Sequence, residues 1–325
     1  MKRLTIAVIA ACTMLSAAAS AETVKIVNIG HGYFSGALYV AKELKLFEKH
    51  GLEPDISFVQ GGALALQAVL NKQVDVGILS YEHVLTVAAQ GKRIVAFFNI
   101  ANRPVNNVIA NEQLVSGSEK MSVEEKIKRL KGARIALPSP NGSGEKMLGT
   151  LAHKYGLKLP GDISTVYVGA EAGAYVAAFQ KDLVDAALPF EPAGVLVQQE
   201  GKGKIYLNVM NGEIPEFRDI LFMTLATHPD IMKEKPALLR KVAAVFAEAQ
   251  RILKTDPKRG KELMAKEYPK MTPETNSQAY DTVSQIWTSD GRMTEEQAKA
   301  TYAYLQPKGQ KVEFSETFTN EFLPK

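Results

Sequence analysis

The sequence predicts an α/β protein of two lobes, each built on a mostly parallel sheet flanked by helices. Short β-branched segments alternate with helical segments along most of the 325 residues. This order is typical of parallel sheets, because a helix usually returns the chain between parallel strands. One such unit occurs twice, at 59–83 and 168–192, with the same sequence of elements. The length is sufficient for two domains of ordinary size.

Residues 1–21 are expected to be a secretory signal peptide and no part of the fold. Lys2 and Arg3 precede an apolar segment at 4–15, which is too short to span a bilayer, and Ala19-Ser20-Ala21 matches a cleavage site. The alternative is a lipoprotein anchored at Cys12, the only cysteine. Cleavage after Ala21 would leave a periplasmic chain without cysteine. Its formal net charge would fall from +4 to +2, too small to indicate nucleic-acid binding.

The elements of the first half follow from periodicity. Alternating or β-branched segments predict strands, and apolar residues at helical spacing predict helices. Strands are expected at 23–29, 55–59, 74–79 and 94–100. Helices are expected at 37–50, 63–70 and 84–90.

The second half repeats this alternation and then changes character. Strands are expected at 134–137, 165–168 and 184–188, with helices after Gly144 and at 174–180. From Asp219 onward, a strand at 220–226 is followed only by helices, of which the longest is expected at 235–253. These last helices are therefore predicted to pack back on the first lobe.

Two chain crossings between the lobes follow from this order. We place them near 99–107 and 210–218, which are polar or rich in helix breakers, as linkers tend to be. Lobe 1 is then discontinuous and comprises 22–103 plus 214–325, and lobe 2 comprises 104–213. Two copies of the repeat indicate two lobes of one design, because a solenoid needs more.

The segment 132–157 combines a short strand, a Gly/Ser-rich loop and the start of a helix. Such a junction leaves backbone N–H groups unpaired at the positive end of the helix dipole, where a small polar or anionic group can bind. Ligands of open α/β sheets bind beyond the carboxyl ends of the strands. The two lobes are therefore expected to form a binding cleft between them.

Long stretches of the chain resemble the periplasmic solute-binding proteins of ABC importers. The stretch GYFSGALYVAKELKLFEKHGLEPDISFVQGG with ALQAVLNKQVDVGILS is similar to their N-terminal lobe. The stretch LKGARIALPSPNGSGEKMLGTLAHKYGL with VYVGAEAGAYVAAFQKDLVDAALPFEP is similar to their second lobe. The group concerned serves nitrate, alkanesulfonates, taurine, bicarbonate and thiamine-pyrimidine precursors. The resemblance covers nearly the whole mature chain and specifies the family better than the ligand.

The resemblance implies a periplasmic-binding-protein fold with two crossings, type II-like, that closes about a hinge. It also implies a small-molecule ligand and, as partner, a permease of the inner membrane with its cytoplasmic ATPase. We expect a monomer without a cofactor or bound metal and without enzymatic activity. The alternatives of another class are a sensory ligand-binding protein and a fold-related enzyme. Relatives of the resembled group that make the thiamine pyrimidine use a Cys-rich motif and iron, and the mature chain expected here contains no cysteine.

The candidate ligand-binding residues lie at the predicted strand ends and in the first crossing. They are His31, Tyr33, Phe34, Gly62, Ser80, Tyr81, Glu82, Arg103, Asn141, Gly142, Ser143, Glu171, Phe190 and Glu191. Tyr33 and Phe34 are expected either to stack on the ligand or to belong to the core. Glu82 and Glu191 occupy matching places in the repeat, and each is either a ligand contact or a carboxylate favoured by a helix dipole.

The charges of these residues favour a ligand that carries amino or ring N–H groups. Glu82, Glu171 and Glu191 would accept hydrogen bonds from such a ligand, whereas a simple anion requires Arg, Lys or free N–H groups. We therefore expect a nitrogen-containing organic solute, such as a thiamine-pyrimidine precursor. The alternative is an anion of the sulfonate, taurine or nitrate type. Arg103 is expected to pair either with a ligand carboxylate or with one of these glutamates.

The sequence does not match the nucleotide-binding, catalytic or metal-binding motifs that it partly resembles. The loop at 141–146 lacks the G-x-x-x-x-G-K-[ST] spacing of a phosphate loop, because Glu145 precedes Lys146 and Met147 follows it. The GYFSG segment at Gly32 has its serine one place too late for a nucleophile elbow. His31, His83 and His228 are not spaced as metal ligands.

Overall fold

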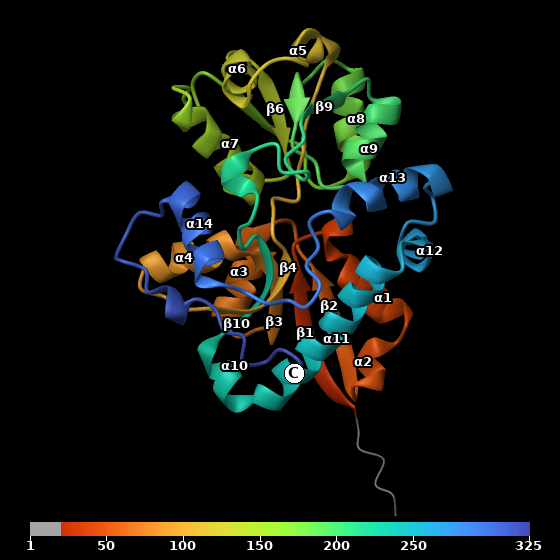
Figure 1. The fold of residues 1–325 in the computed structure, drawn as a ribbon, viewed down its shortest axis with the longest axis vertical. Coiled ribbons are helices and arrows are strands. Elements are labelled where there is room, and N and C mark those ends of the chain that lie inside the picture. The colour runs from red at the N-terminus through yellow and green to blue at the C-terminus, as the bar shows by residue number, and fades with distance from the viewer. Residues whose placement is uncertain (1–20) are drawn as a thin grey trace, which may run out of the picture.

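The computed structural model describes residues 21–325 and consists of two lobes (Figure 1). Each lobe contains one five-stranded sheet. The predicted signal peptide and Cys12 lie outside the described residues, apart from Ala21. The strand order is β2-β1-β3-β10-β4 in lobe 1 and β7-β6-β8-β5-β9 in lobe 2. The predicted two-lobe α/β class is therefore confirmed.

Lobe 1 combines the N-terminal third of the chain with its C-terminal third. Its strands are β1 (Glu22–Asn28), β2 (Leu52–Phe58), β3 (Val76–Ser80), β4 (Val95–Ala101) and β10 (Met223–Thr227). Its first helices are α1 (Gly36–Glu43), α2 (Leu46–Lys49), α3 (Gly62–Leu70) and α4 (Tyr81–Ala89). Its later helices are α10 (Pro229–Glu234), α11 (Pro236–Thr255), α12 (Pro257–Glu267), α13 (Pro273–Ser284) and α14 (Glu295–Leu305). Short 3-10 turns lie at Tyr33–Ser35 and Phe314–Glu316.

Lobe 2 is formed by one continuous stretch of chain. Its strands are β5 (Val108–Ala110), β6 (Arg134–Leu137), β7 (Ser164–Tyr167), β8 (Ala186–Ala187) and β9 (Lys204–Leu207). Its helices are α5 (Glu112–Val115), α6 (Val123–Arg129), α7 (Ser143–Lys154), α8 (Ala172–Gln180) and α9 (Ala193–Glu200).

The two sheets have the same topology. In each, three parallel strands are followed by one antiparallel strand, β10 or β5, which pairs on both sides. Four of the five strands therefore run in one direction. The antiparallel strand is in each case the first strand after a crossing between the lobes.

The crossings lie between β4 and β5 and between β9 and β10, with a 3-10 turn at Pro215–Phe217 in the second. The lobe boundaries that we predicted at 103/104 and 213/214 fall within these two segments. The guanidinium of Arg103 joins the crossings by donating hydrogen bonds to the carbonyl oxygens of Met210 and Arg218, each at 2.9 Å.

The structure differs from the sequence prediction in one helix and in several short elements. The helix predicted at 37–50 is interrupted, because Lys45 adopts a left-handed backbone conformation at φ 51° between α1 and α2. The short strands β5 and β9 and the helices α5, α6 and α9 were not predicted. The strands are too short for their alternation to be recognised, with three and four residues.

The C-terminal helices bring the lobes together. Helix α11 packs its apolar face on α1, and beyond it α13 contacts α9 while α14 contacts α7 (Figure 1). Helices α13 and α14 thus belong to lobe 1 and contact lobe 2 on either side of the boundary. The lobes are therefore in contact, and the conformation is a closed one.

Candidate functional site

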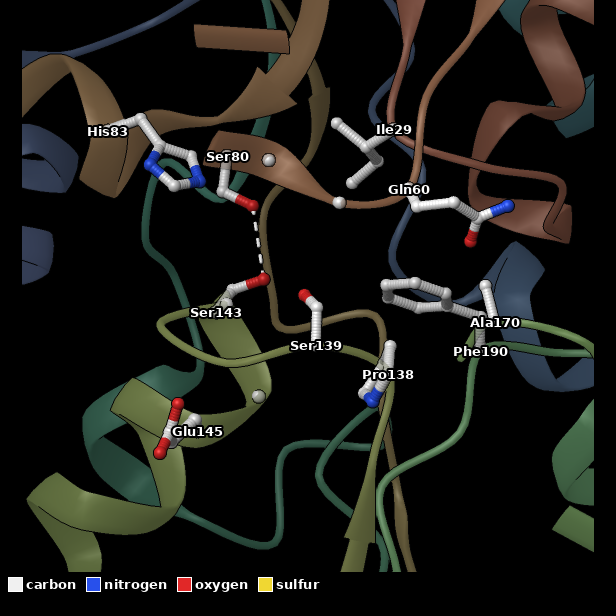
Figure 2. Close-up of a pocket in the computed structure, with 14 residues that line it drawn as sticks. Ile29, Gln60, Ser80, His83, Pro138, Ser139, Ser143, Glu145, Ala170 and Phe190 are labelled. Carbon is white, nitrogen blue, oxygen red and sulfur yellow. Dashed lines mark hydrogen bonds between the residues drawn. The ribbon is translucent and has the colours of Figure 1, made fainter. Parts of the chain in front are cut away.

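A cavity lies between the two lobes at the carboxyl ends of the parallel strands. It encloses about 20 Å³ and is lined by Ile29, Gln60, Gly61, Gly62, Ser80, His83, Pro138, Ser139, Gly142, Ser143, Gly144, Glu145, Ala170 and Phe190 (Figure 2). We call it the interlobe cavity. Its volume is that of about one water molecule. Any larger ligand therefore requires the lobes to move apart.

Two helix N-termini face the interlobe cavity from opposite lobes. Helix α3 of lobe 1 begins at Gly62, and helix α7 of lobe 2 begins at Ser143. Neither has a side chain that accepts a hydrogen bond at its N-cap, because the cap residues are Gly61 and Gly142. The first N–H groups of both helices are thus left without intrahelical partners, and both dipoles have their positive ends at the cavity.

Hydroxyl groups complete the polar lining. Ser80 Oγ of lobe 1 donates a hydrogen bond to Ser143 Oγ of lobe 2 over 3.3 Å, and the close-up shows these two side chains pointing toward one another (Figure 2). Ser139 lies against Gly61, where a β-carbon would stand 2.8 Å from its Oγ. Gly61 also has φ 99°, a conformation that only glycine adopts readily. The two lobes therefore approach closely at this point.

His83 lies beside the N-terminus of α3 and is a neutral hydrogen-bonding group. Burial, with a smaller contribution from the nearby Lys146 charge, lowers its pKa to about 3. Its Nε2 stands 2.1 Å from the place of a β-carbon on Gly62, so only glycine fits there. The imidazole consequently adds a polar atom to the cavity without adding charge.

Glu82 does not line the interlobe cavity, although it was predicted to bind ligand. Its carboxylate is 1% exposed and lies 3.6 Å from Lys146 Nζ of lobe 2. Its second oxygen accepts a hydrogen bond from Tyr304 of α14 at 3.2 Å. Burial raises the pKa of Glu82, and the Lys146 charge opposes this rise. The carboxylate is thus engaged in a contact between the lobes.

Glu191 is also buried, but its carboxylate is held within its own lobe. Oε2 accepts a hydrogen bond from the N–H of Val195 at 2.9 Å, in the first turn of α9. Burial raises the pKa of Glu191 to about 7. Only the main chain of Glu191 crosses between lobes, since its carbonyl oxygen accepts a hydrogen bond from Tyr33 N–H at 2.9 Å.

The remaining acidic and amide candidates lie at the surface of lobe 2. Glu171 is exposed at the N-cap of α8, and Asn141 is exposed ahead of α7. Glu145 contributes to the cavity lining, but its carboxylate is turned away from Ser143 (Figure 2). It accepts hydrogen bonds from Tyr167 Oη and from the N–H of Asn141. No glutamate predicted to hold the ligand therefore lines the interlobe cavity.

Among the aromatic candidates, only Phe190 reaches the interlobe cavity, and its ring centroid is 5.0 Å from that of Phe34. Phe34 and Tyr33 are buried in the core, as is Tyr81. The hydroxyl of Tyr33 donates to Asn276, and that of Tyr81 contacts Thr317. Of the two alternatives, the structure thus places Tyr33 and Phe34 in the core.

Two further candidates lie outside the interlobe cavity. His31 is half exposed, stacks on Phe58 with ring centroids 4.0 Å apart, and stands 3.8 Å from Glu267. Among the residues that the structure describes, Arg103 neither lines the cavity nor forms a salt bridge with a glutamate; two of its five N–H groups donate to carbonyl oxygens of the second crossing segment.

The structure thus brings together Gly62, Ser80, Gly142, Ser143 and Phe190 from the predicted set. Three further residues, Gln60, His83 and Ser139, line the cavity although they were not among the predicted ligand-binding residues. The sequence placed them in the same strand-end loops, but no feature of the sequence distinguished them from their neighbours. Within residues 21–325 no cluster of three metal-ligating side chains was found. In the same range, no helix is both long and apolar enough to cross a membrane.

The chain is similar to a known protein family and to known binding proteins. Residues 33–259 match the family model described as NMT1/THI5 like. A Brucella abortus (strain 2308) protein whose name describes it as a binding protein is 27% identical over 271 residues, which are 82% of this chain and 79% of that protein.

Solved structures share the fold, among them the following two. One is a protein of Bordetella bronchiseptica RB50, with a TM-score of 0.77, 23% identity and coverage of 92% of this chain and 95% of the other. The second is the alkanesulfonate-binding protein SsuA of Xanthomonas axonopodis pv. citri bound to MOPS. Its TM-score is 0.70 at 16% identity, covering 91% of this chain and 98% of the other. The fold is therefore that of the periplasmic binding proteins.

Proposed function

The chain belongs to the NMT1/THI5-like family, and we propose that it is the substrate-binding component of an ABC importer that captures a small organic solute through an oxyanion group. The solute is held between the lobes at the interlobe cavity, which must widen beyond its present volume to fit it, and the ligand-loaded protein delivers it to a permease of the inner membrane. Capture and delivery need no chemical step, so the proposed role is binding and not catalysis.

The convergence of two uncapped helix N-termini carries this proposal. Helices α3 and α7 both direct free N–H groups and the positive end of a dipole at one small space. Ser80, Ser139 and Ser143 add hydroxyl donors there. Sulfonate and carboxylate groups, which carry several acceptor oxygens, match this set of donors.

The expectation of a nitrogenous ligand rested on three glutamates that do not line the interlobe cavity. Glu82 is engaged by Lys146 and Tyr304, and Glu191 by the backbone of α9. Without them, an amine or ring N–H would face a surface composed mostly of donors. The anion alternative therefore fits the lining better. The alkanesulfonate named for one structural relative is consistent with this choice.

The apolar part of the lining indicates an organic rather than an inorganic anion. Ile29, Ala170 and Phe190 lie on the side of the cavity opposite His83 (Figure 2). They offer a short apolar surface to the remainder of a ligand whose charged group lies between the helices. We propose that the lobes part about the two crossings to admit it, with boundaries at 103/104 and 213/214. The ligand then favours closure by binding the closed form better.

Location and assembly complete the proposal. A periplasmic monomer is consistent with the predicted signal peptide and with the fold. A sensory role would use the same capture step and would differ only in the membrane partner. Pull-down of a permease or of a receptor by the ligand-loaded protein distinguishes the two.

The experiment that tests the proposal is calorimetric titration with two matched sets of small ligands. One set consists of alkanesulfonates and carboxylates, and the other of aminopyrimidines of similar size. We expect binding by the first set and none by the second. Ser143→Asp, which places a carboxylate at the start of α7, should weaken anion binding by at least about tenfold, or 1.4 kcal/mol.

The matched control is Ser122→Asp at the N-cap of α6, far from the interlobe cavity, which should bind like the unmodified protein. Binding of the aminopyrimidines alone, or equal anion affinity in Ser143→Asp with the fold intact, would contradict the proposal.

A further inference from the structure

We propose that Asn141-Gly142 is a self-modification site, at which the chain converts Asn141 to aspartate or isoaspartate without an enzyme. Asn-Gly occurs twice in the sequence, at Asn141-Gly142 and at Asn211-Gly212. The first lies immediately before α7 at the rim of the interlobe cavity, and the second lies in the crossing between β9 and β10. The structure leaves the first free to react and restrains the second.

The reaction uses only the chain and water. The backbone nitrogen of Gly142 attacks Cγ of Asn141, and its proton passes to solvent. A C–N bond forms and the Cγ–Nδ2 bond breaks. The departing NH2 group takes up a proton from solvent and leaves as ammonia, and a five-membered imide remains. Water then opens the imide at either carbonyl. One product is aspartate, and the other is isoaspartate, in which the main chain runs through the former side chain.

Asn141-Gly142, where Asn141 has φ 57°, has several features that favour this reaction. Asn141 is exposed, and its side chain makes no hydrogen bond within the described part of the chain. The N–H of Gly142 likewise has no hydrogen-bond partner there, because it lies at the N-cap of α7. The dipole of α7 favours negative charge at this position and so stabilises the deprotonated nitrogen that attacks, against the opposing charge of Glu145, whose carboxylate accepts a hydrogen bond from Asn141 N–H.

Asn211-Gly212 lacks these features although its sequence is the same. The side-chain oxygen of Asn211 accepts a hydrogen bond from Glu213 N–H at 3.0 Å, which fixes the amide in place. The N–H of Gly212 donates to the carbonyl oxygen of Val209 at 3.0 Å, and Gly212 is buried. Attack there requires these hydrogen bonds to break first.

The consequence for binding rests on the proposed function. Either product places a new carboxylate beside the uncapped start of α7, where the ligand's oxyanion group is proposed to bind. The isoaspartate also lengthens the main chain directly before Gly142. Both changes oppose anion capture, so the protein would lose affinity as it ages, with no change elsewhere in the fold.

The modification is tested by holding the folded protein at mildly alkaline pH and mapping its peptides by mass spectrometry over time. We expect Asn141 to convert at least about tenfold faster than Asn211. In the unfolded protein both sites should react at similar rates, because the hydrogen bonds that distinguish them are lost. Gly142→Ala, at a position with ordinary φ of −77°, should slow conversion of Asn141. Equal rates at the two sites in the folded protein, or faster reaction at Asn211, would overturn the proposal.

The effect on capture is tested separately with Asn141→Asp and methanesulfonate as the probe. We expect affinity about three- to tenfold weaker than that of the unmodified protein, the size of a helix-dipole effect on one charge. Equal affinity would overturn the consequence for binding. If the unmodified protein does not bind methanesulfonate, the proposed function fails for this probe, and the modification itself is still decided by the peptide map.

Discussion

Glu82 and Glu191 occupy the same place in the two copies of the internal repeat, yet their carboxylates bind different partners. Both follow the third parallel strand of their lobe, and both are almost fully buried. Glu82 is paired across the lobe boundary with Lys146, whereas Glu191 is held by the backbone of α9 in its own lobe. The partner therefore decides the role. Glu82 depends on closure, and Glu191 stabilises the local structure of one lobe.

The largest effect is expected from removing the partner of Glu82. Lys146→Met should leave a buried carboxylate without its counter-charge, at a cost of about 3–5 kcal/mol if the lobes stay closed. Because opening returns Glu82 to water, we expect the protein to avoid most of this cost by populating the open form. X-ray scattering should show an increased radius of gyration.

The matched control for this prediction is Lys128→Met, which removes an exposed pair with Glu124 within α6 and should change stability by about 0.5 kcal/mol or less. Unchanged compactness and stability in Lys146→Met would show that the pair does not support closure.

The second effect is a pH dependence that belongs to Glu191. Its pKa in the folded protein is about 7, above the ordinary value of 4.5. The folded state therefore holds this proton more tightly, and its contribution to the free energy of unfolding falls as pH rises from 4.5 to 7, by about 3 kcal/mol in total. Glu191→Gln should remove this fall.

Denaturant unfolding at about pH 5 and about pH 8 measures the difference between the two proteins. A wild-type protein that loses no stability relative to Glu191→Gln between these conditions would contradict the assignment.

A third, smaller effect compares the two glycine caps that face the interlobe cavity. Gly61→Ala forces a non-glycine residue to φ 99° and presses on Ser139 Oγ, so we expect destabilisation by about 1–3 kcal/mol. Gly142→Ala retains an ordinary φ and brings its β-carbon only to 3.2 Å from Ser139 Oγ, so it should cost less, about 1 kcal/mol or below. Thermal melting of the two variants provides the test, and equal losses would count against the backbone argument.

The smallest effect concerns the hydrogen bond that the lobes share. Ser80→Ala and Ser143→Ala each remove one end of the same bond, so each should cost about 1 kcal/mol or less. The double variant should cost no more than either single one, because the bond can be lost only once. Additive losses would mean that each hydroxyl has a separate partner in the closed protein.

The two glutamates also show how far the sequence could predict the site. The repeat, the alternation of elements and the uncapped start of α7 can be recognised in the sequence itself. They predicted strand-end positions for Gly62, Ser80, Gly142, Ser143 and Phe190, and these residues line the interlobe cavity. The partners of Glu82 lie on α7 and α14, far along the chain. No local pattern indicates that Lys146 and Tyr304 will engage this carboxylate. The predicted ligand charge depended on these glutamates and was therefore the part of the site least supported by local sequence.

The fold was predicted better than the site for the same reason. The spacing of apolar residues revealed the parallel strand and helix units, because each helix or strand buries one face over several turns or residues. It did not reveal β5 or β9, whose place is determined by pairing with strands elsewhere in the sheet. It also did not distinguish His83 and Ser139 from neighbouring loop residues, since their roles depend on how closely the two lobes approach.

The position of β10 has a consequence for the order in which the protein can be completed after synthesis. All five strands of lobe 2 lie between Val108 and Leu207, so this lobe can assemble its whole sheet as soon as that stretch is available. Lobe 1 begins first but lacks the strand that separates β3 from β4 until Met223–Thr227 has been made. Until then, the edges of β3 and β4 that pair with β10 have no partner strand. A nascent chain cut before residue 223 would contain one finished lobe and one that cannot close its sheet.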